Sequence, residues 1–185
     1  MATTPVTLGP QDGSIKVRTY REGMAARAGH DLVMEATTWN AAAHVDHANP
    51  AMSTVQATVD LGSLEIREAS GGVKPLSDGD RKDIFKNLAK TLATDKHPQA
   101  LFQSKSVLPE GDTKLHVNGD LTIAGSTKPV TLELEIKPEN GVDRLVGSIT
   151  VHHTHFGVKP FSGLLGALKI RDAVEIDLDM RVPRN

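Results

Sequence analysis

The stretch GDLTIAGSTKPVTLELEI, residues 119–136, decides the fold class of this chain. In its second half, apolar side chains occupy every other position from Val130 to Ile136, and Thr or Glu fills the positions between them. Residues 114–123 alternate in the same manner, and the Gly-Ser-Thr-Lys-Pro run between the two segments is typical of a hairpin connection. Because successive side chains of a strand point to opposite faces, this period predicts antiparallel strands with one apolar and one polar face.

The same period recurs elsewhere in the chain. Residues 173–182 alternate strictly, and residues 54–64 and 99–108 alternate more loosely. About eight or nine strands follow, and a sheet of that size with one apolar face must curl or fold onto itself. We therefore predict a mostly β protein, one antiparallel β-barrel domain of about eight strands over residues 1–185, in which residues 1–12 form a flexible N-terminal extension.

One segment breaks the period of two. Ser77 has the character of a helix N-cap, with Asp80 three residues further on. Apolar side chains then recur at helical spacing from Ile84 to Leu92. The pattern predicts one α-helix, at about residues 77–93, that packs against the barrel.

Composition excludes several classes of function. The chain has 38% hydrophobic and only 3% aromatic residues, and a net charge of −2 from 21 basic and 23 acidic residues, which disfavours nucleic-acid binding. It has no cysteine, so disulfides, thiolate metal sites and a cysteine nucleophile are excluded. No secretory signal pattern opens the chain and no apolar run approaches the ~18–20 residues of a membrane span. We therefore expect a cytoplasmic protein without a membrane span, and a homodimer stays open.

The central stretch also carries a resemblance to a known family. The run Gly-Asp-Leu-Thr-Ile-x-Gly-x-Thr-Lys-Pro-Val at residues 119–130 closely resembles a signature of the bacterial YceI-like family. The run HPQALFQSKSV at residues 97–107 and the run HTHFGV at residues 153–158 are similar to further family features, in the expected order. The likeness extends from about residue 12 to residue 182. His153 and His155 stand where the family usually has Arg and Asp.

The resemblance implies a fold and a function. It implies an extended, lipocalin-like barrel that holds a polyisoprenoid, an isoprenoid quinone or a similar amphiphilic chain. Many members of the family are periplasmic, but this chain shows no leader that would carry that location over. We expect non-catalytic binding, storage or transport of such a ligand, with no cofactor beyond a bound lipid-like molecule.

Motifs of catalysis are missing from the sequence. It contains no Gly-x-Ser-x-Gly elbow, and its Gly-rich segments lack the spacing of a phosphate-binding loop. We therefore expect no enzyme. A filled-barrel interaction module is a further alternative.

Three histidines in the run VHHTHFGVKP, residues 151–160, raise the question of a metal. If the strand continues through them, His153 and His155 share the inward side near one barrel end and His152 lies on the other. Two ligands fall short of the three or four protein donors that stable zinc sites use, so we expect no tightly held metal. A metal-binding protein or metal-dependent enzyme that uses His153 and His155 stays open as an alternative.

The residues expected to contact a ligand come from the inward faces, the aromatic positions and the apolar loop after the histidines. We predict that His153, His155 and Phe156 close one end of the cavity, and that the loop up to Leu168 forms a lid. The full set of candidates is His30, Trp39, Phe102, Leu121, Ile123, Leu132, Leu134, His153, His155, Phe156, Phe161, Leu164 and Leu165.

Overall fold

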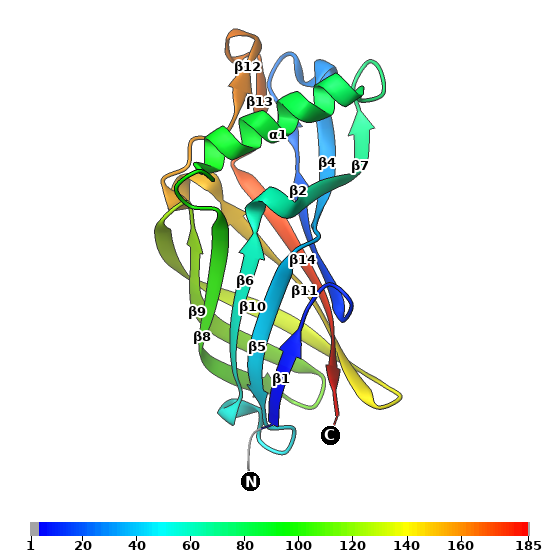
Figure 1. The fold of residues 1–185 in the computed structure, drawn as a ribbon, viewed down its shortest axis with the longest axis vertical. Coiled ribbons are helices and arrows are strands. Elements are labelled where there is room, and N and C mark those ends of the chain that lie inside the picture. The colour runs from blue at the N-terminus through cyan, green and yellow to red at the C-terminus, as the bar shows by residue number, and fades with distance from the viewer. Residues whose placement is uncertain (1–3, 185) are drawn as a thin grey trace.

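The fold is one large, strongly curled antiparallel sheet with a single α-helix across one end (Figure 1). It is seen in a computed structural model that describes residues 4–184. The strands of the main sheet are β1 (Thr4–Leu8), β2 (Gly13–Thr19), β4 (His30–Ala36), β5 (Trp39–Val45), β6 (Thr54–Asp60), β7 (Leu64–Gly71), β8 (Gln99–Glu110), β9 (Lys114–Ile123), β10 (Ser126–Glu139), β11 (Val142–His152) and β14 (Ala173–Pro183). The mostly β, lipocalin-like fold predicted from the sequence is confirmed.

The sheet has eleven strands, in the order β1-β5-β6-β8-β9-β10-β11-β14-β2-β4-β7. The sequence-based number of about eight was therefore too low. The undercount arises partly around residues 30–45, which form two strands; β5 carries three consecutive alanines, so the contrast between its two faces is weak. A strand of small residues gives little periodic signal, although its backbone pairs as well as any other.

The N-terminal segment is part of the sheet. The expectation that residues 1–12 form a flexible extension is wrong for β1, which pairs antiparallel with β5 from Thr4 opposite Val45 to Leu8 opposite Ala41. The side chain of Leu8 is buried in the core. A strand of five residues is too short to show its period in the sequence, and its apolar contacts come from β5. Residues 1–3 lie outside the described part of the chain.

The hairpin between β9 and β10 forms where the sequence predicts it. Ser126 pairs with Ile123, so the turn consists of Ala124 and Gly125, with φ angles of 49° and 77°. Positive φ at both central residues matches the right-handed twist of the two strands. Glycine adopts this conformation without strain, which explains Gly125 in the motif.

The predicted helix is confirmed as α1 (Asp78–Leu92), one residue shorter at each end than the predicted range. The Ser77 side chain accepts a hydrogen bond from the Asp80 N–H, and the Asp80 carboxylate accepts one from the Ser77 N–H. This reciprocal capping fixes where the helix begins. Ile84 and Leu88 pack against the larger core cluster, so α1 lies across the end of the barrel (Figure 1).

A small three-stranded sheet projects beyond α1 (Figure 1). It consists of β12 (Ser162–Gly163), β13 (Leu168–Ile170) and β3 (Arg21–Glu22). The remaining elements are the 3-10 turns η1 (Ala26–Ala28), η2 (Pro50–Met52), η3 (Leu61–Ser63), η4 (His153–Phe156) and η5 (Leu164–Gly166). The start of β1 and the end of β14 lie at the end of the barrel opposite α1 (Figure 1).

Candidate functional site

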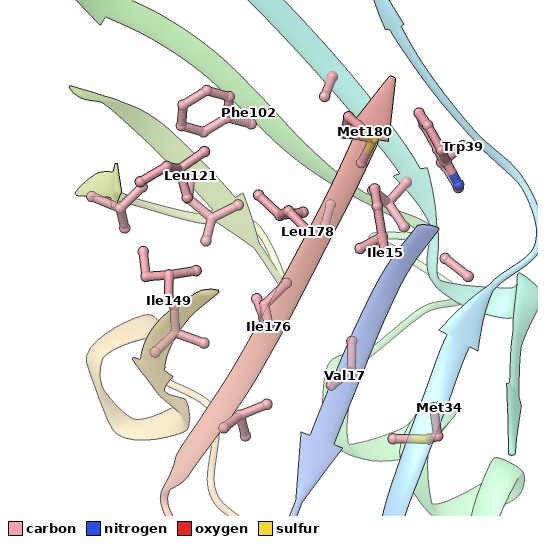
Figure 2. A pocket seen from close by; sticks show the side chains of 18 of the residues that line it. Ile15, Val17, Met34, Trp39, Phe102, Leu121, Ile149, Ile176, Leu178 and Met180 are labelled. Atoms are coloured by element: carbon pink, nitrogen blue, oxygen red, sulfur yellow. The ribbon is translucent and has the colours of Figure 1, made fainter. Parts of the chain in front are cut away.

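A cavity of about 1290 Å³ runs through the inside of the curled sheet. Its lining extends from α1 at one end to Asp143 and Arg184 at the other, and apolar side chains dominate it between these ends (Figure 2). This volume exceeds the ~300–1,000 Å³ of ordinary small-molecule pockets. The barrel is therefore hollow, which contradicts the alternative of a filled-barrel interaction module.

The alternating strands build the wall of the cavity. On β9, β10 and β14 apolar residues at alternate positions line it, as the period of two predicts. These inward residues are Leu115, Val117, Leu121, Ile123, Val130, Leu132, Leu134, Ile136, Pro138, Val174, Ile176, Leu178, Met180 and Val182. Leu178 and Met180 of β14 face Leu121 and Phe102 across the space (Figure 2).

Small side chains on one part of the wall keep the interior open. Ala36, Ala41, Ala43 and Ala57 all line the cavity, on β4, β5 and β6. A methyl group projects far less into the space than the Leu or Ile that the opposite wall presents. Because the inward side chains on this side are small, the cavity stays wide.

Two of the aromatic candidates, Trp39 and Phe102, lie in the wall. Trp39 is only 4% exposed, belongs to the larger core cluster and also lines the cavity. Its Nε1–H has no hydrogen-bond partner among the described residues. Phe102 lies on β8 and lines the cavity next to Leu121 (Figure 2).

A bulge explains the loose alternation of β8. The register against β9 shifts between Ser104 and Ser106, so the strand changes phase there. Phe102 lines the cavity before the bulge and Val107 after it, while Leu108 faces outward. The sequence of this strand shows the phase change as a weaker period.

The helix contributes the cover of one end, which the list of candidates missed. Ile84, Leu88 and Leu92 line the cavity, as does Leu76 just before the helix. Their helical spacing predicts packing against the barrel, and the structure shows that the same face also meets the cavity. An amphipathic stripe in the sequence does not show whether the apolar face of a helix packs on other side chains or faces a cavity.

The histidines do not continue the strand. β11 ends at His152, and the chain turns into η4, so the prediction that His153 and His155 share one face of a strand is wrong. The turn is held from a distant segment: the N–H and hydroxyl of Thr154 donate to the carboxylate of Asp172, at 2.9 and 2.7 Å. The His153 N–H donates to the main-chain oxygen of Asp172.

The turn places the three histidines in different surroundings. His152 and His153 line the cavity, whereas His155 is exposed and lies outside it, with its ring 5.0 Å from that of His152. Phe156 is buried and lines the cavity, as predicted. The end of the cavity is therefore closed by His153 and Phe156 without His155.

Of the other candidates at this end, some line the cavity and others do not. His30 lines the cavity, and its Nε2 lies 2.9 Å from the main-chain oxygen of Lys74. Phe161 lines it as well. Leu164 and Leu165 do not, because η5 turns them outward, where they are 60% and 109% exposed. These two leucines, predicted as ligand contacts, therefore lie outside the lining of the cavity.

The opposite end of the cavity is polar, which the sequence did not indicate. His47 contacts the main-chain oxygen of Pro183 at 3.1 Å and has its Nδ1 3.4 Å from the Asp143 carboxylate, which also pairs with Arg184. Three segments far apart in the sequence meet here. No local sequence pattern predicts that these segments lie together, because strand pairing alone brings them together.

Most displaced pKa values belong to groups outside the cavity. Arg144 donates two hydrogen bonds to Asp179, at 2.8 and 2.6 Å on the outer face, and lowers the pKa of that carboxyl. Only Asp80 and Arg184 among the shifted groups line the cavity, at opposite ends.

The corner near η4 has one shifted carboxyl. Burial opposes ionisation of Asp172, but the two hydrogen bonds from Thr154 and the nearby His152 and His153 outweigh it and lower its pKa. Within residues 4–184, no three His, Asp or Glu side chains converge in a metal-binding cluster. The same part of the chain holds no helix that is both long and apolar enough to cross a membrane.

A curled antiparallel sheet around a deep apolar cavity, capped by one helix, defines the class of lipocalin-like barrels with an internal binding space. The model of the YceI-like domain matches residues 11–182. The chain belongs to the YceI-like domain family.

Curated relatives and solved structures agree with this assignment. Protein YceI of Shigella flexneri is 38% identical over 91 residues, a match that covers 49% of this chain and 41% of the relative. The matched part thus spans less than half the length of that protein. Among solved structures, BcnA of Burkholderia cenocepacia is 21% identical with a TM-score of 0.68, and the match covers 91% of this chain and 96% of BcnA.

A polyisoprenoid binding domain from Saccharophagus degradans, implicated in plant cell wall breakdown, is 9% identical with a TM-score of 0.63, over 99% of both chains. At these identities the structural matches establish a shared fold.

Proposed function

We propose that the protein binds, stores or transports a long apolar or amphiphilic molecule in its cavity and performs no catalysis. The single observation that supports this proposal is the cavity of about 1290 Å³ with its apolar wall. Each methylene removed from water contributes ~0.8 kcal/mol, so a long hydrocarbon chain can bind tightly there with few polar contacts. A cavity built for small polar substrates would need more convergent hydrogen-bonding groups.

An isoprenoid chain is the ligand class we favour. The structural neighbour from Saccharophagus degradans is a polyisoprenoid binding domain by name, and the cavity of this chain is lined mainly by apolar side chains. Branched methyl groups fit a wall that alternates Leu, Ile and Val with Ala. We propose that the ligand tail lies along the middle of the cavity and that a polar head group lies at one of the two ends.

The residues we propose as ligand contacts follow from the lining. They are the sequence candidates that line the cavity, together with three residues of α1 that cover one end of it. The set is His30, Trp39, Phe102, Leu121, Ile123, Leu132, Leu134, His153, Phe156, Phe161, Ile84, Leu88 and Leu92.

Trp39 offers a direct test, since it is the only tryptophan and lines the cavity. Titration with a polyprenyl alcohol should give a saturable change in its fluorescence. Affinity should rise with the number of isoprene units until the cavity is filled. N-acetyltryptophanamide in the same titration controls for optical effects of the probe. Absence of uptake, together with consistently empty protein in native mass spectrometry after purification from its source, would reject the proposal.

A further inference from the structure

Two adjacent leucines project into solvent at the end of the β12–β13 hairpin. Leu164 and Leu165 are 60% and 109% exposed, and they form what we call the leucine tip. Both have left-handed backbone angles, with φ of 50° and 55°. This conformation is unfavourable for a side chain as large as leucine, and burial does not compensate for it here. Strained, exposed apolar residues of this kind cluster at functional positions.

A third exposed apolar side chain lies beside the tip. Met24 is 97% exposed, and its neighbours on both sides contact the hairpin. The Ala25 N–H donates to the main-chain oxygen of Ala167 at 2.8 Å, and a Cβ at Gly23 would lie 2.4 Å from the same oxygen. The loop after β3 and the hairpin are therefore held together, and they present apolar side chains from two distant parts of the sequence.

The charge around the tip is positive, although the chain as a whole is negative. The end of the molecule that carries α1, made up of residues 21–31, 72–97 and 157–172, has eleven Lys and Arg against seven Asp and Glu. The rest of the chain has ten against sixteen. Nearest the tip, Arg27 and Lys159 are exposed and form no ion pair within 4 Å in the described part of the chain.

The same hairpin reaches into the cavity. Leu168 and Ile170 of β13 line it, while the leucine tip faces away. The lining comes to the surface close by, at the exposed Ala28 of η1, a turn that contacts β13. An apolar molecule that entered here would pass directly from the surroundings of the tip into the cavity.

We propose that the leucine tip and Met24 dock the protein onto an anionic phospholipid surface, with the basic residues around them facing the head groups. The apolar side chains can enter the lipid layer, and the positive charge of this end of the molecule attracts the anionic head groups. A protein partner with an apolar groove would not require the surplus of positive charge. Docking would bring the cavity opening to the lipid, and this last step alone rests on the proposed function.

Vesicle co-sedimentation without added ligand tests the docking. The protein should bind vesicles of phosphatidylcholine with about one third phosphatidylglycerol, and bind pure phosphatidylcholine at least tenfold more weakly. The double variant Leu164→Ser/Leu165→Ser should lower the affinity at least tenfold. Leu101→Ser/Leu108→Ser removes two exposed leucines from the outer face of β8 and serves as its matched control, with binding unchanged.

A second pair of variants tests the charge. Lys159→Gln/Lys169→Gln should weaken binding to the anionic vesicles about tenfold, since each basic residue near a charged surface contributes severalfold. Lys114→Gln/Lys128→Gln changes the net charge equally at exposed sites on β9 and β10 and should have no effect. If the double leucine variant misfolds, as judged by circular dichroism, Leu165→Ser alone serves the same test.

Several outcomes would overturn the docking. They are a wild-type protein that ignores anionic vesicles, a leucine variant that binds like its control, and self-association without vesicles that the leucine variant abolishes. The last result would assign the tip to contact between copies. If the protein does not bind vesicles but Trp39 still reports polyprenyl uptake, the docking proposal fails and the proposed function is unaffected. If it binds vesicles but takes up no polyprenyl alcohol, the proposed function fails and the docking proposal is unaffected.

Discussion

The ring of Phe102 occupies the space that a side chain at residue 119 would need. Gly119 lies on β9 opposite Ser104 of β8, and a Cβ at this position would lie 2.6 Å from Phe102 Cζ and 2.5 Å from the Gln103 main-chain oxygen. The first glycine of the central motif thus lets the aromatic residue of the neighbouring strand lie flat against the wall. Two features that the sequence shows separately belong to one packing arrangement.

Gly119→Ala should therefore destabilise the protein by about 1–3 kcal/mol, the range for overpacking a close-fitted site. Urea unfolding measures it. Gly79→Ala, where a new Cβ would lie 3.7 Å from the Ser77 hydroxyl oxygen, should be neutral or slightly stabilising. Adding Phe102→Leu should restore part of the loss. No recovery would mean that the Gln103 oxygen alone causes the clash.

Cavity volume can be removed without touching the fold. Ala43 faces the cavity and its neighbour Ala42 faces solvent on the same strand. Ala43→Phe should raise the dissociation constant for a polyprenyl alcohol at least tenfold, or about 1.4 kcal/mol, because the ring occupies ligand space. Ala42→Phe should bind like wild type. Equal affinity of the two variants would show that the ligand lies elsewhere.

The helix cap should influence both stability and ligand release. Ser77→Ala removes the hydroxyl that accepts the Asp80 N–H and should cost about 1 kcal/mol in unfolding free energy. Because α1 covers one end of the cavity, stopped-flow displacement should also show faster ligand dissociation. Ser77→Thr keeps the acceptor and should behave like wild type. Destabilisation without faster release would show that ligands leave by the other end.

Acid should weaken the pair on the outer face. The hydrogen bonds from Arg144 lower the pKa of Asp179 in the folded protein below the ordinary aspartate value of 3.8. A carboxyl whose folded pKa is lowered stabilises the fold above the unfolded pKa and loses that contribution as pH falls through the folded value. Asp179→Asn should thus destabilise the protein at neutral pH, and its difference from wild type should shrink below about pH 4.

Thermal unfolding across pH measures this effect. Asp95→Asn removes an exposed carboxylate that makes no ion pair within 4 Å in residues 4–184, and it should leave the profile of the wild type unchanged. A difference between Asp179→Asn and wild type that stays constant down to pH 2 would contradict the assignment.

The sequence determined the faces of the sheet and the ends of the helix. Leu121, Leu134 and Ile176 line the cavity because alternation along a strand fixes the face of each residue, whatever lies across from it. The helix begins at Asp78 because Ser77 and Asp80 satisfy each other's main-chain N–H groups. Both are local properties, carried by residues within a few positions of one another.

Tertiary structure decided the rest. The strand stops at His152 because Asp172, far along the chain, binds Thr154 and holds the turn that separates His153 from His155. Whether the inward residues fill the barrel or leave it hollow depends on the distance between opposite walls, which eleven strands and their pairing set together. A period of two specifies the face of a residue, but only strand pairing specifies what that face meets.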